Sequence, residues 1–180
     1  MNPAAAERIS PFEALTHGFS HPAVMPAPAG GDRAADLQAR QGLQAGGMLL
    51  MIRYEHGSEL TEMPMLHALP DAPSWLLGVA NLHGMLTPVI DLAAFAGESA
   101  PPPVRPMLMV LSQGADAAGI VIDGLPRRLR WDGAVQDPAG TAPLALLPHV
   151  HGSVLFEGQL WFDLNCSSLL DGFERSLQGL

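Results

Sequence analysis

The sequence predicts an all-β protein built from two similar subdomains, and two observations lead to that prediction. Short apolar runs of strand length alternate with glycine-containing turns, and few stretches show helical periodicity. In addition, the segment 78–92 has a counterpart at 152–164. In both, two glycines bracket five residues, and a short apolar strand ending in Asp-Leu follows. An internal repeat of this kind is typical of a fold made from two related units.

Composition narrows the class of protein further. The chain has 180 residues, 48% of them hydrophobic, and a formal net charge of −9. It can therefore bury a proper core, while its acidity argues against a nucleic-acid partner. One cysteine, Cys166, excludes an internal disulfide and fits a reducing compartment. No secretory leader and no uncharged apolar run of membrane-helix length is visible, which predicts a cytoplasmic protein without direct membrane insertion.

The first 40 residues differ in composition from the rest of the chain. Residues 1–40 are rich in Ala and Pro, which predicts a flexible extension, with the globular domain at 41–180. Within the extension, residues 9–15 combine a serine cap, a proline and two apolar side chains suited to one helical face. A frayed helical turn is the favoured interpretation of this segment, and a docking peptide is the alternative.

The domain opens with elements of strand length and reaches its most regular stretch at 73–92. The apolar run Met48–Ile52 is expected to be a strand, and a second short element is expected at 59–63. Within 73–92, an apolar run begins at Trp75. Asn81-Leu82-His83-Gly84 is typical of a corner between two strands, where Gly84 can take a positive φ.

The strand after this corner, 86–92, contains a proline. Pro88 has no N–H to donate to a ladder, which predicts an edge position or a bulge. Asp91 is placed to cap the short helical turn expected at 92–95. A stiff proline-rich linker at 98–103 closes the first half of the domain.

The second half repeats the same pattern and ends in a helix. Strands are expected at 107–111, 117–123 and 125–131, and a helical turn is expected at 144–147, inside a long connection. After the second copy of the repeat, residues 166–180 have the apolar spacing of an amphipathic helix.

The run Trp-Leu-Leu-Gly-Val-Ala-Asn-Leu-His-Gly, followed by Pro-Val-Ile-Asp-Leu, resembles the signature of the CheW-like family of chemotaxis adaptors. The resemblance covers about residues 42–172. It implies two packed five-stranded β-barrels, at about 41–98 and 104–165, and a short C-terminal helix at 166–180. The Ala/Pro-rich extension and the sequence around Glu59 resemble the branch associated with type IV pilus systems, the PilI-like branch.

The resemblance also implies a function and a set of contact residues. Family members couple the cytoplasmic tip of chemoreceptors to a CheA-type histidine kinase, without catalysis, and receptor contact lies in an apolar groove between the barrels. The positions matched to that groove are Glu59, Gly78, His83, Met107, Gly119 and Leu125. For Met107 and Leu125, a plain core position is the competing interpretation. His83 departs from the arginine usual in the family, which removes a fixed charge from that position.

Other side chains that suggest chemistry have simpler structural explanations. His149 and His151 point to one face if they lie on a strand, but no Cys-x-x-Cys or His-Glu-x-x-His motif accompanies them, so we expect no metal site and no cofactor. Cys166 precedes an amphipathic helix, where a partly buried structural cysteine is commoner than a nucleophile. The basic segment 127–131 fits equally well a solvated strand face and a contact with an acidic partner surface such as the kinase.

Two functions from different classes therefore follow from the sequence. The first is a non-catalytic adaptor whose partners are a CheA-type histidine kinase and a chemoreceptor tip. The alternative is a small-ligand-binding β-barrel, since barrels of this size can hold a ligand in the mouth. Filled barrels favour the adaptor, whereas an open apolar pocket lined by Trp131 or Trp161 favours the ligand binder.

Overall fold

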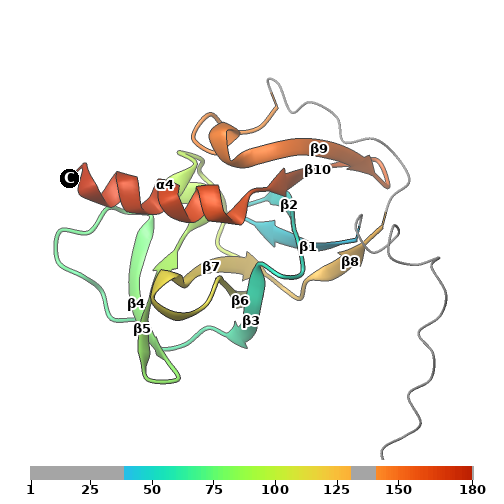
Figure 1. The fold of residues 1–180 in the computed structure, drawn as a ribbon. Helices are drawn as coiled ribbons and strands as arrows, with labels where there is room; N and C mark the ends of the chain where they lie inside the picture. The colour runs from blue at the N-terminus through green and yellow to red at the C-terminus, as the bar shows by residue number, and fades with distance from the viewer. Residues whose placement is uncertain (1–38, 131–140, 180) are drawn as a thin grey trace, which may run out of the picture. The chain divides into compact units, whose positions relative to one another are not determined.

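The computed structural model describes residues 39–130 and 141–179 (Figure 1). The segment at 9–15 and most of the N-terminal extension lie outside the described residues, as does Trp131. The described chain forms two five-stranded sheets, two α-helices and two 3-10 turns.

The first sheet has the strand order β8-β1-β2-β10-β9. Its strands are β1 (Arg40–Ala45), β2 (Met48–Ile52), β8 (Arg127–Leu129), β9 (Val150–Phe156) and β10 (Gln159–Leu164). The second sheet has the order β3-β6-β7-β5-β4. Its strands are β3 (Gly57–Glu62), β4 (Leu76–Leu82), β5 (Met85–Ile90), β6 (Pro106–Leu111) and β7 (Ala118–Asp123). The helices are α3 (Leu92–Phe95) and α4 (Cys166–Gln178), and the 3-10 turns are η1 (Gly114–Asp116) and η2 (Leu147–His149).

The two sheets have the same internal plan, as the repeat predicts. Each contains one parallel pair, β10 with β2 or β5 with β7, and its other pairs are antiparallel. The hairpin β9–β10 stands in the first sheet where β4–β5 stands in the second. The prediction of two related five-stranded units is therefore confirmed.

Two features of the predicted fold need correction. Within the described residues, no strand pairing joins β8 to β9 or β3 to β4, so the sheets are open and do not close into barrels. The sheets also do not divide the chain at 98–104: the first takes β1 and β2 from one half and β8, β9 and β10 from the other, while the second is built from the continuous segment 57–123. Strand pairing in three dimensions, which local sequence does not specify, sets this division.

Three of the observed elements differ from the predicted ones. Strand β1 was not predicted, because its alternating polar and small residues lack an apolar run; its neighbours β2 and β8 hold it in place. The helical turn expected at 144–147 begins at Leu147 instead. β5 is an inner strand, and it tolerates Pro88 because β7 pairs only with Val89 and Ile90.

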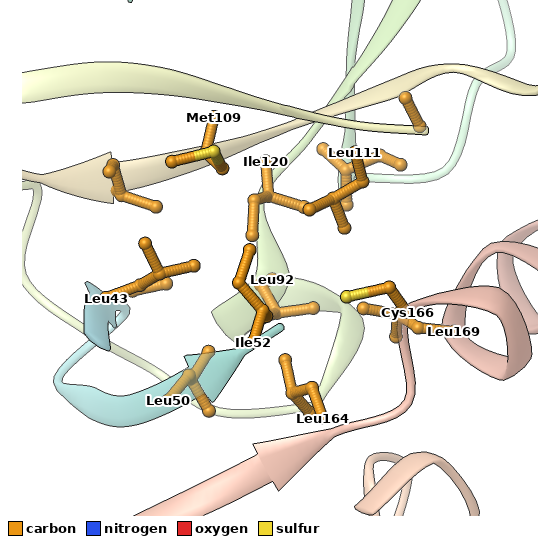
Figure 2. Packing of buried hydrophobic residues seen from close by; sticks show 14 of the residues in the cluster. Leu43, Leu50, Ile52, Leu92, Met109, Leu111, Ile120, Leu164, Cys166 and Leu169 are labelled. Atoms are coloured by element: carbon orange, nitrogen blue, oxygen red, sulfur yellow. The ribbon is translucent and has the colours of Figure 1, made fainter. Parts of the chain in front are cut away.

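The largest apolar cluster lies between the two sheets and under α4 (Figure 2). Leu50 and Ile52 from the first sheet meet Met109 and Ile120 from the second, and Leu169 of α4 closes the cluster. Two smaller clusters are each formed by strands of one sheet, around Trp161 in the first sheet and around Leu108 in the second. Because both sheets contribute to the main cluster, neither can bury its apolar face without the other.

Candidate functional site

The corner between β4 and β5 positions the first candidate site residue. His83 has φ +52° and Gly84 has φ +86°, so both residues lie in the left-handed region that tight hairpins need. The Asn81 side chain accepts a hydrogen bond from the Gly84 amide at 2.9 Å, which holds the turn. This geometry confirms the predicted corner and directs His83 toward the neighbouring edge strand.

That edge strand, β3, carries the second candidate residue. The His83 Nε2 atom lies 3.0 Å from Glu59 Oε1 and 3.1 Å from Oε2. The His83 side chain is 78% exposed and that of Glu59 is 34% exposed, so the pair is accessible from solvent. Together the two side chains connect β3 to the β4–β5 hairpin, where no backbone hydrogen bonds join those elements among the described residues.

A cleft of about 250 Å³ lies beside this pair. Its lining mixes apolar and hydroxyl-bearing or amide side chains, among them Leu82, Met85, Val110, Ser58, Thr87 and Gln113. The cleft therefore presents both apolar and polar groups beside the Glu59–His83 pair.

The other four predicted contact residues are not gathered at this cleft. Gly78 and Gly119 are buried backbone positions: a Cβ at Gly78 would collide with the His67 carbonyl, and one at Gly119 would lie 2.6 Å from Leu108 Cδ1. Met107 is 8% exposed and belongs to the main core cluster, as its competing interpretation expected. Leu125 is 63% exposed and lies between β7 and β8.

The first sheet contains an equivalent pair that sequence reasoning missed. Glu157, at the β9–β10 corner, has φ +52° and precedes Gly158, as His83 precedes Gly84. Its Oε2 lies 3.1 Å from Nη1 of Arg127 on the edge strand β8, so the charges are reversed relative to the second sheet. The Arg127 guanidinium also lies 4.7 Å from the ring centre of Trp161. In the sequence repeat, Glu157 occupies the position equivalent to His83, so the glycine spacing could have identified it.

The residues considered for chemistry have structural roles. Burial, and then the charge of Asp163, raise the pKa of the Cys166 thiol to about 12, so this cysteine is a poor nucleophile. In the described part of the chain, no three His, Cys, Asp or Glu side chains are grouped so as to hold a metal ion. Trp161 is 3% exposed and packs against Met51 and Leu129. The ligand-binding alternative needs an open apolar pocket lined by Trp161, and this side chain is instead buried in a packed cluster.

Comparison of the sequence with models of known protein families identifies the family of this chain. A family model described as "CheW-like domain" matches residues 42–174. The chain belongs to the CheW-like family. None of the described helices is long and apolar enough to cross a membrane.

Several CheW-like proteins are similar to this chain. It is 29% identical to Protein PilI of Pseudomonas aeruginosa over 128 residues, which covers 67% of this chain and 68% of PilI. It is 34% identical to Protein FrzA of Myxococcus xanthus over 99 residues, 51% of this chain and 61% of FrzA. The similarity to PilI is consistent with the pilus-associated branch.

A solved structure shares the fold. The scaffolding protein TtCheW from Thermoanaerobacter tengcongensis superposes with a TM-score of 0.61 at 17% identity, covering 71% of this chain and 88% of TtCheW. At that identity the likeness concerns the fold alone. It agrees with the arrangement of two five-stranded sheets described above.

Proposed function

We propose that this CheW-like chain is a non-catalytic adaptor that binds the cytoplasmic tip of a chemoreceptor and a CheA-type histidine kinase, in chemotaxis or pilus motility. Family membership supports the class of function. The observation that supports this chain's own contact surface is the Glu59–His83 pair, which is accessible from solvent and whose histidine lies on the corner that carries the family signature. An adaptor of this kind needs only two surfaces whose contacts differ between receptor states, because such differences carry coupling free energy.

Charge reversal at Glu59 tests the receptor surface. We expect Glu59→Arg to weaken binding of a receptor cytoplasmic fragment and to make the remaining binding less sensitive to salt, because exposed interface charges mainly affect association. Glu62→Arg is the matched control: Glu62 ends the same strand and is also exposed, but it does not line the cleft. Binding is measured by calorimetry, and kinase activity is measured in a mixture of receptor fragment, CheA-type kinase and adaptor.

A second change asks whether the pair acts as a unit. The double variant Glu59→Arg with His83→Glu restores opposite charges in swapped positions, so it should recover part of the loss, since contacting residues couple and distant ones add. If the effects of the two substitutions on binding free energy simply add, the two residues do not act as a pair. Unchanged affinity of Glu59→Arg for both partners would remove this surface altogether.

The surface proposed to contact the kinase is the edge strand β8. Arg127 and Arg128 lie on the exposed edge strand β8 of an otherwise acidic chain, which favours an acidic partner surface there. Arg128→Glu should therefore weaken kinase binding and leave receptor binding unchanged. The opposite result would assign β8 to the receptor.

A further inference from the structure

His149 contacts the N-cap residue and the first two turns of the C-terminal helix. Its side chain is buried, with 4% of the residue exposed, at the end of η2. Its carbonyl accepts a hydrogen bond from the amide of Asn165, the N-cap residue of α4, at 2.8 Å. Its Nδ1 atom lies 2.7 Å from Ser168 Oγ. Its ring lies against Gly172, where a Cβ would be 2.6 Å from Nε2.

The rest of the attachment of α4 is a narrow apolar stripe. Leu169 and Phe173 are its buried large apolar side chains. The Phe173 ring lies 4.7 Å from that of Phe95 and 5.9 Å from that of Trp75, centre to centre. Clefts of about 90 Å³ and 360 Å³, each lined in part by Trp75, lie along the helix. α4 is therefore held by this apolar stripe, by its N-terminal cap and by the contacts of His149.

The surroundings of His149 favour the neutral ring. Burial, and secondarily the positive charge of Arg175, lower the pKa of His149, while the carboxylate of Asp171 opposes this shift. Both charged residues lie on α4. The other residues lining the adjacent 360 Å³ cleft are Trp75, Phe95, Ala145, Gly172 and Ser176, none of which carries a charge. That cleft gives protons a route to the ring.

We propose that His149 makes the seating of α4 sensitive to protons: the helix is docked while the ring is neutral and loosens when the ring is protonated, uncovering the apolar surface of Trp75 and Phe95. This device is independent of the adaptor role. It concerns a different part of the molecule from the Glu59–His83 pair, because no residue of η2 or α4 lines the cleft at that pair.

The direction of the pH effect follows from linkage. A base whose pKa is lowered in the docked state binds fewer protons there than in the released state, so acid favours release. The docking free energy should be fully present above the ordinary histidine pKa of about 6.5 and should be lost as pH falls through the lower pKa of the docked state. Within that window, the equilibrium constant for release should rise by up to about tenfold per pH unit, the limit for one proton.

Hydrogen exchange of the full chain between pH 7.5 and 5 tests the proposal. We expect the α4 amides to lose protection on acidification, after correction for intrinsic exchange rates, while the β6–β7 amides keep it. His149→Gln removes the titrating ring and should abolish the pH dependence. His151→Gln is the matched control, because His151 is exposed and lies two residues further along β9. Protection of α4 that does not change with pH in the parent protein would overturn the proposal.

Two exposed substitutions keep the test decisive if His149→Gln fails to fold. Arg175→Gln removes a charge that lowers the pKa of His149, so the pH-dependent loss of protection should become smaller. Asp171→Asn removes a charge that raises this pKa, so the loss should become larger. Opposite effects of the two variants support the proposal. An equal pH dependence in both would show that a different group controls α4.

Discussion

The β4–β5 corner depends on two adjacent residues in the left-handed backbone region, His83 and Gly84. A Cβ at Gly84 would meet nothing within 4 Å, so any penalty for a side chain there is conformational and not steric crowding by neighbours. At His83 the side chain already bears such a penalty and gains only an exposed contact with Glu59.

These two positions should therefore respond oppositely to substitution. Gly84→Val should lower the free energy of unfolding by about 1 kcal/mol or more, because a β-branched residue at positive φ is strained. His83→Gly should leave stability unchanged or slightly raised, because glycine adopts positive φ freely. Urea unfolding followed by circular dichroism measures both. Equal losses in the two variants would contradict this account of the corner.

A buried ion pair links the start of β1 to the end of β10. Arg40 Nε lies 3.0 Å from Asp163 Oδ1, and Nη2 lies 3.2 Å from Oδ2, in a forked arrangement. The two side chains are 11% and 5% exposed. Asp163→Asn leaves the guanidinium buried without its carboxylate, and removing one partner of a buried pair costs roughly 3–5 kcal/mol.

The exposed pair Arg53–Glu55 provides the control for this prediction. Its atoms are 3.5 Å apart and its side chains are 52% and 68% exposed. Glu55→Gln should change the free energy of unfolding by no more than about 1 kcal/mol. If chemical denaturation shows the same small loss for Asp163→Asn, the Arg40–Asp163 pair does not hold the first sheet together.

Among the elements, the single-turn helix α3 depends most on its cap. Asp91 Oδ1 accepts hydrogen bonds from the amides of Ala93 at 2.9 Å and Ala94 at 3.1 Å, as the sequence predicted for this residue. The helix matters to packing because Ala93 fits directly against Gly46, in the turn between β1 and β2. The capped helix α3 therefore connects the β4–β5 hairpin of the second sheet to the β1–β2 turn of the first sheet.

Removing this cap should weaken the contact between the sheets. We expect Asp91→Ala to cost about 1 kcal/mol, within a range of roughly 0.5–2 kcal/mol, and Asp91→Asn to cost less because the amide oxygen can still accept. Asp116→Ala, at an exposed position in η1, serves as the control. Thermal unfolding of the three variants decides the point, and a loss in Asp91→Asn equal to that in Asp91→Ala would indicate that charge, and not capping, matters.

Across the whole domain, the interleaved strands couple the two sheets. Residues 57–123 form the second sheet, and the chain on either side of that segment forms the first. Taken in the order β8, β9, β10, β1, β2, the first sheet follows the same path as β3 to β7 in the second. β1 and β2 therefore correspond to β6 and β7 of the second sheet, although they come first in the chain. The main core cluster lies between both sheets.

This arrangement predicts one cooperative unfolding transition for the domain. Unfolding of either sheet exposes the other sheet's part of the main core cluster, so partly folded states should not accumulate. Far-UV circular dichroism reports on both sheets, and the tryptophan fluorescence includes Trp75, which packs against the main core cluster, and Trp161 in the first sheet. The two signals should give coincident denaturation curves. Separate midpoints would show that the sheets are independent subdomains.

The sequence by itself determined the local features of this protein. Strands such as β2 and β6, the corner at Gly84, the cap at Asp91 and the helix α4 follow from apolar periodicity, positive φ and capping, which depend on residues close together in the chain. The similarity of the two five-stranded units was also predicted, because the same glycine spacing occurs at 78–84 and at 152–158. The family resemblance assigned Glu59 and His83 to the same groove, and the structure shows that the two side chains are in contact.

Only the tertiary structure decided which strands share a sheet and what lies between them. The pairing of β10 with β2 joins segments more than a hundred residues apart, and no local pattern encodes that choice. The Arg40–Asp163 pair, the Arg127–Glu157 pair and the seating of α4 on His149 all follow from it. The tertiary structure also decided the burial of Gly78, Met107 and Gly119, because exposure depends on what packs above a residue and not on the residue type.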